Sequence, residues 1–188
     1  MRKLRNIFNI SLLILSVLIS TSGILSAGSA TKDIEISIVP IVTTSLISSP
    51  TYYNFGNLEV ATSSNSETAL LLTNDGTVGI KIEKTVLSDD GWDITKSTNQ
   101  IDGFNLWGQV NPTRPAIAEF TVSDTHQFSK SGIGESYYSN LTDDSGVQID
   151  MDPGDNRNFW LRIDMPSALT ESRSQKIQLR LKAIANTD

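Results

Sequence analysis

Apolar and polar residues alternate one by one along the C-terminal part of the chain, and this pattern restricts the fold more than any other feature. Apolar residues occupy every second position of 177–185, with Gln178, Arg180 and Lys182 between the first four of them. Since successive side chains of a β-strand point to opposite faces, such a segment buries one face and exposes the other to water. The predicted inward residues are Ile177, Leu179, Leu181, Ala183 and Ala185.

The same alternation recurs earlier in the chain. The stretches "DIEISIV" and "TVGIKIEKTVL" each place apolar residues on one face, namely Ile34, Ile36 and Ile38 in the first and Val78, Ile80, Ile82 and Val86 in the second. Further strands are predicted within 55–60, 67–74, 104–110, 116–122, 146–151 and 159–165. Beyond residue 30 no stretch of the sequence sustains a 3.6-residue apolar period. The sequence therefore predicts an all-β, immunoglobulin-like antiparallel β-sandwich of about eight or nine strands.

The first 30 residues have the layout of a secretory signal peptide. Three basic residues precede the largely apolar run 7–19, and small residues follow up to Ala30. The apolar run is shorter than the roughly 20 residues that a spanning helix needs, although a retained anchor is the alternative. We expect cleavage after Ala30 and an extracytoplasmic product that is secreted or held at the cell surface, with the periplasm as another destination. No membrane span is expected after cleavage.

Residues 31–188 are expected to form one domain, with a loose insertion at about 111–145 where proline, glycine and serine are frequent. This part of the chain carries twelve basic and twenty-one acidic residues, a formal net charge of −9. Nucleic acid is therefore not an expected partner, because phosphate backbones are bound through clustered lysine and arginine. The chain contains no cysteine, so neither a disulfide nor a lipid on cysteine is predicted.

One stretch, "YNFGNLEVATSSNSETALLLTNDGT", pairs an apolar strand containing Phe-Gly with a second apolar strand that ends in Asn-Asp-Gly. It resembles the first half of hydin-like immunoglobulin-fold domains and the FG-x-V modules of secreted bacterial proteins. The matching residues are Phe55, Gly56, Leu58, Val60, Leu70, Leu72, Thr73, Asn74 and Gly76. We expect Phe55 to fill the core, Gly56 to permit a bulge, and Asn-Asp-Gly to reverse the chain between antiparallel strands.

A second likeness involves the stretches "GWDIT", "GFNLWGQV" and "NFWLRIDMPSALTESRSQKIQLRLKAIAN". They resemble the closing half of uncharacterised secreted bacterial β-sandwich proteins of similar length. Domains of this type usually serve as scaffolds, adhesins or subunits of surface assemblies, and the resemblance implies such a role here. It implies no catalytic residue.

The residues themselves give little reason to expect an enzyme. His126 is the only histidine, it lies in the polar stretch "SDTHQFSKSG", and we interpret it as a solvated loop residue. A serine-type triad would have to use it, yet the sequence contains no G-x-S-x-G elbow to present the serine. Carboxylate pairs of the glycosidase type stay open, because acidic residues are plentiful and their separation is unknown. We expect no catalytic site.

Five aspartates form the densest group of chemically active residues. Asp143, Asp144, Asp150, Asp152 and Asp155 lie within thirteen positions and make a candidate calcium site, since calcium prefers oxygen ligands. The order of residues does not match an EF-hand loop. The alternative is the solvated face of a strand followed by a Pro-Gly turn. No other metal and no cofactor is expected.

Aromatic residues allow a second function. Adjacent residues in a strand point to opposite faces, so the pairs Tyr52/Tyr53, Tyr137/Tyr138 and Phe159/Trp160 could each present one ring outward for stacking against sugars. The three tryptophans are equally suited to fill the core of a sandwich without disulfides. A carbohydrate-binding module is thus the alternative to the main interpretation.

The main interpretation is a secreted structural or interaction protein of the cell surface, either with protein partners or as a subunit that assembles with itself. Residues 31–50 are apolar and interrupted by proline, and they lie next to the expected new N-terminus. An extended segment of this kind can add a strand to a neighbour's sheet. The alternative is an ordinary first strand of the sandwich followed by a loop.

We expect export of the full-length protein to release a chain that begins at Thr31, because small residues at positions 28 and 30 suit signal peptidase. Intact-mass measurement of the exported protein tests this expectation. An N-terminus at Met1, or within the apolar run, would contradict it and favour a retained anchor.

Overall fold

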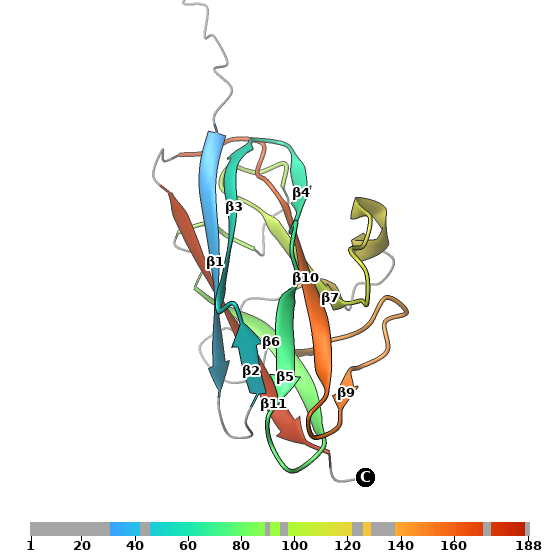
Figure 1. Ribbon diagram of the computed structural model, residues 1–188. Coiled ribbons are helices and arrows are strands. Elements are labelled where there is room, and N and C mark those ends of the chain that lie inside the picture. The colour runs from blue at the N-terminus through green and yellow to red at the C-terminus, as the bar shows by residue number, and fades with distance from the viewer. Residues whose placement is uncertain are drawn as a thin grey trace, which may run out of the picture.

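A computed structural model describes residues 31–41, 46–88, 91–94, 98–121, 126–128, 138–170 and 174–186. The described residues form two β-sheets that face each other, as Figure 1 shows. The predicted all-β sandwich is therefore confirmed.

The first sheet, sheet A, joins the two ends of the described chain. Its strand order is β3, β1, β11, β6, and two very short strands, β8 and β9, both pair with β6. The bounds are β1 Thr31–Ile41, β3 Tyr52–Glu59, β6 Ile80–Ser88, β8 Ser139–Asn140, β9 Asp150–Met151 and β11 Gln175–Ala185.

The second sheet, sheet B, is arranged around β10. This strand pairs with β5 and β4 along one edge and with β7 along the other, and β2 extends the sheet beyond β5. The bounds are β2 Leu46–Ser49, β4 Ser63–Asn65, β5 Leu70–Asn74, β7 Asn105–Val110 and β10 Asn156–Asp164. The 3₁₀ turn η1 spans Ile117–Thr121, and among the described residues no helix is long and apolar enough to cross a membrane.

Two details differ from the predicted antiparallel sandwich. Eleven strands are formed among the described residues rather than eight or nine, because the short strands β2, β4 and β8 carry too few residues to show a period. The pairing of β1 with β11 is parallel. Parallel neighbours cannot be joined by a tight turn, but β1 and β11 belong to opposite ends of the chain and need no direct connection.

The core lies between the two sheets and follows the predicted alternation. Ile34 and Ile36 of β1 are fully buried, as are the alternate positions Ile177, Leu179 and Leu181 of β11. From sheet B the core receives Leu70 and Leu72, together with Phe104, Leu106, Phe159, Leu161 and Ile163. Ala185, predicted to point inward, is exposed at the end of β11, and the side chain of Ile38 lies outside the described residues.

The Asn-Asp-Gly sequence makes the predicted turn, but it connects the two sheets rather than two neighbouring strands. β5 ends at Asn74 in sheet B, and the chain resumes as β6 in sheet A. The buried Asn74 side chain accepts a hydrogen bond from Gly76 N at 3.1 Å and donates to the carbonyls of Val78 and Met151. One asparagine thus satisfies the backbone where the chain changes sheets.

The Phe-Gly part of the same stretch forms the expected bulge. The pairing of β1 with β3 shifts between Ile34 and Glu35, and Gly56 adopts a φ of 69° that favours glycine. Phe55 is half-buried; it packs against the core and meets Tyr53 edge-on, with ring centroids 4.8 Å apart.

The prediction of a strand within 116–122 is wrong. Residues 117–121 form η1 instead, because Pro115 precedes it and Glu119 stabilises a helical turn. The Glu119 carboxylate accepts a hydrogen bond from Ala116 N at 2.6 Å, while Glu119 N donates to Ala116 O at 3.0 Å. This reciprocal contact satisfies backbone groups locally, as in a helix cap.

Gly108 marks the tightest contact in sheet B. A Cβ atom there would lie 2.6 Å from Phe159 Cε2 and 2.7 Å from Phe128 Cε2, whereas a Cβ at Gly79 would meet no atom closer than 3.7 Å. We expect Gly108→Ala to lower the free energy of unfolding by about 1–3 kcal/mol through overpacking, and Gly79→Ala to change it by less than about 0.5 kcal/mol. Urea denaturation of both variants measures the difference, and equal values would show that the two rings move aside freely.

Candidate functional site

The N-terminal strand lies in the interior of sheet A. β1 pairs in parallel with β11 from Ile34↔Gln175 to Ile41↔Lys182, and it pairs with β3 in the antiparallel direction from Thr31↔Glu59 to Ser37↔Tyr52. Within the described residues β3 has no other strand partner. We call the space between β3 and β11 that β1 occupies the β1 slot (Figure 1).

The inward and the outward side chains of β1 differ in how much they stabilise the strand in this position. Ile34 and Ile36 are fully buried, and burying an isoleucine stabilises the fold by about 1.5–3 kcal/mol. On the opposite face Glu35 lies 3.7 Å from Lys176 of β11, and both side chains are exposed. Such a surface ion pair contributes little to stability. The buried isoleucines and the two backbone ladders therefore hold β1 in place.

The segment 31–50, which the sequence suggested as a strand for a neighbour, is divided between the two sheets. β1 belongs to sheet A, and β2 pairs with β5 in sheet B. Pro50 follows β2 through a cis peptide bond and leads into β3. In a single chain β1 thus completes its own sheet, which is the alternative that the sequence left open.

The outer face of sheet B carries a second apolar cluster beneath the insertion. Trp107 and Trp160 point away from the main core and are nevertheless buried, because Phe120 of η1 packs over them together with Ala69. Phe159 and Trp92 lie in the main core. All three tryptophans are therefore buried. Of the pair Phe159/Trp160, Trp160 is the residue that points outward, but Phe120 covers it.

Polar contacts fasten the described part of the insertion to this face. The Arg162 guanidinium stacks on Trp107 at 4.7 Å and donates to Ile117 O at 2.7 Å, while Asp164 binds it from the side at 2.8 Å. Arg114 donates to Ser66 O at 3.0 Å, and the Asn65 amide donates to Pro115 O at 3.1 Å. Where it is described, the segment expected to be loose is packed against the sheet.

His126 belongs to the same buried layer, so its interpretation as a solvated residue is wrong. Its side chain is fully buried, with Nδ1 3.2 Å from Phe120 O and Nε2 2.6 Å from Asp143 O. A carbonyl oxygen only accepts hydrogen bonds, so a ring nitrogen can bond to either carbonyl only as an N–H donor. The histidine ties two parts of the insertion together.

Exposed aromatic rings are few in the part of the chain that the structure describes. Tyr52 is 56% exposed, whereas the Tyr53 hydroxyl accepts a hydrogen bond from Glu67 N at 2.6 Å. The Tyr138 ring lies 5.0 Å from the Lys182 ammonium. Tyr137 lies outside the described residues. Tyr52 alone does not make a row of rings.

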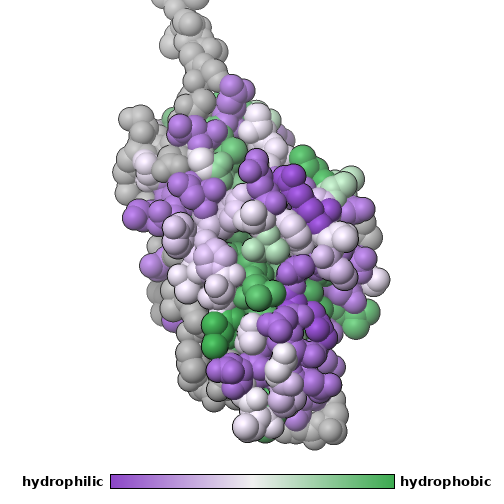
Figure 2. All heavy atoms as spheres, viewed as in Figure 1, coloured by the Kyte–Doolittle hydropathy of each residue, from purple (hydrophilic) through white to green (hydrophobic). Residues whose placement is uncertain are grey.

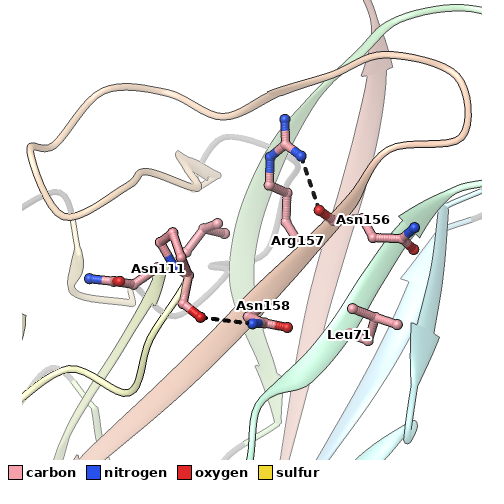
Figure 3. Close-up of a pocket in the computed structure, with 7 residues that line it drawn as sticks. Leu71, Asn111, Asn156, Arg157 and Asn158 are labelled. Carbon is pink, nitrogen blue, oxygen red and sulfur yellow. Dashed lines mark hydrogen bonds between the residues drawn. The ribbon is translucent and has the colours of Figure 1, made fainter.

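A groove of about 370 Å³ opens on the outer face of sheet B where the cover of the insertion ends. Its walls are residues 110–112 at the end of β7, residues 156–158 at the start of β10, and Leu71 of β5. Figure 3 shows Asn158 between Asn111 on one side and Leu71 on the other. In the view of Figure 2 apolar side chains are exposed in the middle of the face and bordered by hydrophilic ones.

The five predicted calcium ligands do not converge on one point among the described residues. Asp143 Oδ1 accepts hydrogen bonds from Ser145 N and Val147 N, both at 2.9 Å, and Asp155 Oδ2 accepts from Arg157 at 2.8 Å. Asp144, Asp150 and Asp152 are exposed. No group of three or more acidic, histidine or cysteine side chains in the described ranges is close enough to hold a metal ion. Calcium binding stays a prediction.

Lys84 is a buried residue that the sequence analysis missed. It takes the inward position of β6 between Ile82 and Val86, which the predicted inward row leaves out, whereas Val78, predicted to point inward, is 46% exposed. The ammonium nitrogen lies 2.6 Å from Asn140 O and 5.6 Å from the centre of the Phe128 ring. Desolvation by burial lowers the pKa of Lys84 to about 7. The one sequence feature that could have indicated its burial is its spacing, because Lys84 follows Ile80 and Ile82 at the same two-residue interval.

A scan against protein-family models finds no match to the chain, and a search of curated proteins finds none either. Functional inference therefore rests on the β1 slot, the outer face of sheet B and the groove.

We expect the stability of the protein to rise with pH between about 7 and 10, because folding lowers the pKa of Lys84 from 10.5 to about 7. In that window the unfolded chain binds more protons than the folded one, so raising the pH favours folding. The free energy of unfolding should increase by about 2 kcal/mol from pH 7 to pH 9. The cost of the buried charge is fully present below pH 7.

Lys84→Met is the matched variant, since it keeps an unbranched side chain without the amine. Urea denaturation at several pH values should show that the rise is absent in Lys84→Met. The variant should gain most, relative to the natural protein, at pH 7 and below. An unchanged pH dependence in the variant would mean that another group causes it.

Proposed function

We propose that the protein is a secreted structural or interaction protein of the cell surface, and that it assembles by exchange of β1. In the assembly, β1 of one copy fills the β1 slot between β3 and β11 of a neighbour. The observation that carries this proposal is the position of β1, a strand near the expected mature N-terminus that is hydrogen-bonded along both edges.

Exchange preserves the contacts that the single chain already makes. A neighbour's β1 would bury the same isoleucines and form the same two ladders, so the change in contact energy is confined to the connection from β1 to β2. Exchange of an identical element is a low-cost route to oligomers for this reason. Because β1 is the first strand of the described chain, it can leave its sheet without threading the rest of the polypeptide.

Exchange of β1 allows either a reciprocal dimer or an extended assembly. The donated strand and the slot that receives it are different surfaces, so each contact is heterologous. Heterologous contacts form rings only if the rotation closes, and otherwise they produce open filaments. A chain of subunits, each giving one strand and receiving one, would suit a structural role outside the cell.

Other observations support the extracytoplasmic setting and a non-catalytic role. The first 30 residues have the features of a signal peptide, and residues 31–188 are acidic. Both ring nitrogens of the only histidine contact carbonyl oxygens in a buried layer, which leaves this ring no nitrogen for a substrate. The resemblance to secreted bacterial sandwich domains implies the same class of role.

Two single-cysteine variants test exchange directly, since the natural chain contains no cysteine. Glu35 and Lys176 are strand partners with exposed side chains. Glu35→Cys and Lys176→Cys chains are mixed, unfolded, refolded together and oxidised. We expect a disulfide-linked heterodimer on a non-reducing gel, because only exchange places the two positions side by side in different chains.

The matched control replaces Lys176→Cys by Asp152→Cys, an exposed position away from β1. This mixture should give no heterodimer above the background of random collision. Light scattering on the natural protein reports the size of any assembly. If the Glu35→Cys and Lys176→Cys mixture also stays at background while the double variant closes its disulfide within one chain, β1 remains in its own sheet and the exchange proposal fails.

A further inference from the structure

The groove on the outer face of sheet B is bordered by three asparagines and is separate from the β1 slot. Asn111 follows β7, Asn156 and Asn158 lie on β10, and Leu71 lies on β5. The groove brings together residues that are about 40 positions apart in the sequence. Its volume of about 370 Å³ lies within the range of 300–1,000 Å³ that is usual for small-molecule sites.

Two of these asparagines have hydrogen-bonding capacity that the fold does not use. Asn158 Nδ2 donates to Pro112 O at 3.1 Å, and within the described residues its Oδ1 accepts no hydrogen bond. Asn111 Oδ1 accepts from Thr113 N at 3.1 Å, while its Nδ2 donates to no group in the same described part of the chain. Figure 3 shows the Asn158 amide lying across the groove with its free oxygen toward Leu71, whereas the Asn111 amide lies at the border and points away from Asn158.

The charge at the groove is balanced. The Arg157 guanidinium donates to Asp155 Oδ2 at 2.8 Å and to Asn156 O at 3.0 Å. This pair leaves no net charge to attract a phosphate or a carboxylate. Asn156 is also engaged, because its Oδ1 accepts from the Thr73 hydroxyl at 2.6 Å.

Apolar side chains complete the walls. Leu71 is 39% exposed although it is a leucine on a sheet face, and Pro112 is exposed at the opposite wall. The groove has no aromatic lining residue. A ligand there meets a C–H surface on two sides and amide groups between them.

We propose that this groove binds a neutral saccharide. Sugar hydroxyls donate and accept at once, which suits paired amide donors and acceptors, and the C–H faces of a sugar ring suit Leu71 and Pro112. An apolar ligand would leave the amides without partners, at a cost in free energy. An anion would find its only cation already paired. A nucleobase would lack a ring to stack on.

The saccharide site is independent of the proposed assembly. It lies on sheet B, whereas the exchanged strand belongs to sheet A. It also differs from the aromatic platform that the sequence suggested, since its recognising groups are asparagine amides.

NMR titration of the mature protein with maltotriose, cellotriose and chitotriose tests the site. At least one of these neutral trisaccharides should shift the side-chain amide signals of Asn111 and Asn158 and the backbone signal of Leu71. The dissociation constant should be on the order of 1 mM, as for a weak small-ligand site. Trialanine amide, titrated in parallel, probes the peptide class.

Three variants distinguish a binding role from a structural one. Asn158→Ala should weaken saccharide binding about fivefold or more, because it removes an acceptor and a donor. Asn111→Asp keeps the oxygen that binds Thr113 but removes the free donors, so it should weaken binding without disturbing the turn. Asn57→Ala, an exposed asparagine of β3 outside the groove, should leave the affinity unchanged.

Each result decides for or against the site. Shifts at the groove that weaken in Asn158→Ala and Asn111→Asp but not in Asn57→Ala support it. Shifts caused by trialanine amide alone would identify a peptide site and overturn the proposal. The absence of groove shifts with all three trisaccharides, or equal affinity in every variant, would also overturn it.

Discussion

The insertion of β1 between β3 and β11 is the contact on which sheet A depends. Among the described residues β3 pairs with no other strand, so without β1 the sheet would lose an edge strand as well as its centre. The core would lose Ile34 and Ile36 at the same time. The ladder between β1 and β11 joins the first strand of the described chain to the last, so the fold is completed by a contact of very long sequence separation. Such contacts form late, because the entropy of closing a long loop must be overcome first.

This order of folding also bears on assembly. Until β11 is in place, β1 lacks a strand partner on one edge, and the β1 slot is incomplete. A neighbouring chain can then supply either the strand or the slot. The physics that completes the single chain is thus the same physics that would link two chains.

The outer face of sheet B is divided into a covered half and an open half. Over the covered half, Trp107 and Trp160 are shielded by Phe120, and Arg162 joins the layer by stacking on one ring and bonding the backbone of η1. Trp160 also donates from its indole nitrogen to Asn111 O at 2.9 Å, which fixes the chain where it leaves β7. The cover ends at that point. The groove therefore lies at the boundary, with one wall from the insertion and the other from the open sheet.

The sequence predicted what depends on a local period and missed what depends on distant contacts. The inward residues of β1 and β11 follow from strict alternation, and the bulge at Gly56 follows from a single glycine in a strand. Lys84 was missed because a lysine interrupts an apolar row, although its position in the row is inward. His126 lies among polar residues and was expected in solvent, but it is buried, and its ring nitrogens contact carbonyl oxygens 6 and 17 positions away. The groove has no local signature at all, since its walls come from three strands and its key feature is the unused bonding capacity of two amides.

The locations of the two proposed surfaces have a consequence for binding strength. A saccharide held by two amides and two aliphatic walls binds weakly at any one groove. Exchange of β1 would occur in sheet A and leave the open half of sheet B uncovered, so every subunit of an assembly would still present its groove. Linked sites that bind a polymeric ligand together raise the overall affinity by a factor of about 10²–10⁴, provided that the spacing allows simultaneous contact. Weak recognition by one subunit and repetition of that subunit are therefore complementary, because a repeating polysaccharide can be held by many grooves that would each release a single sugar quickly.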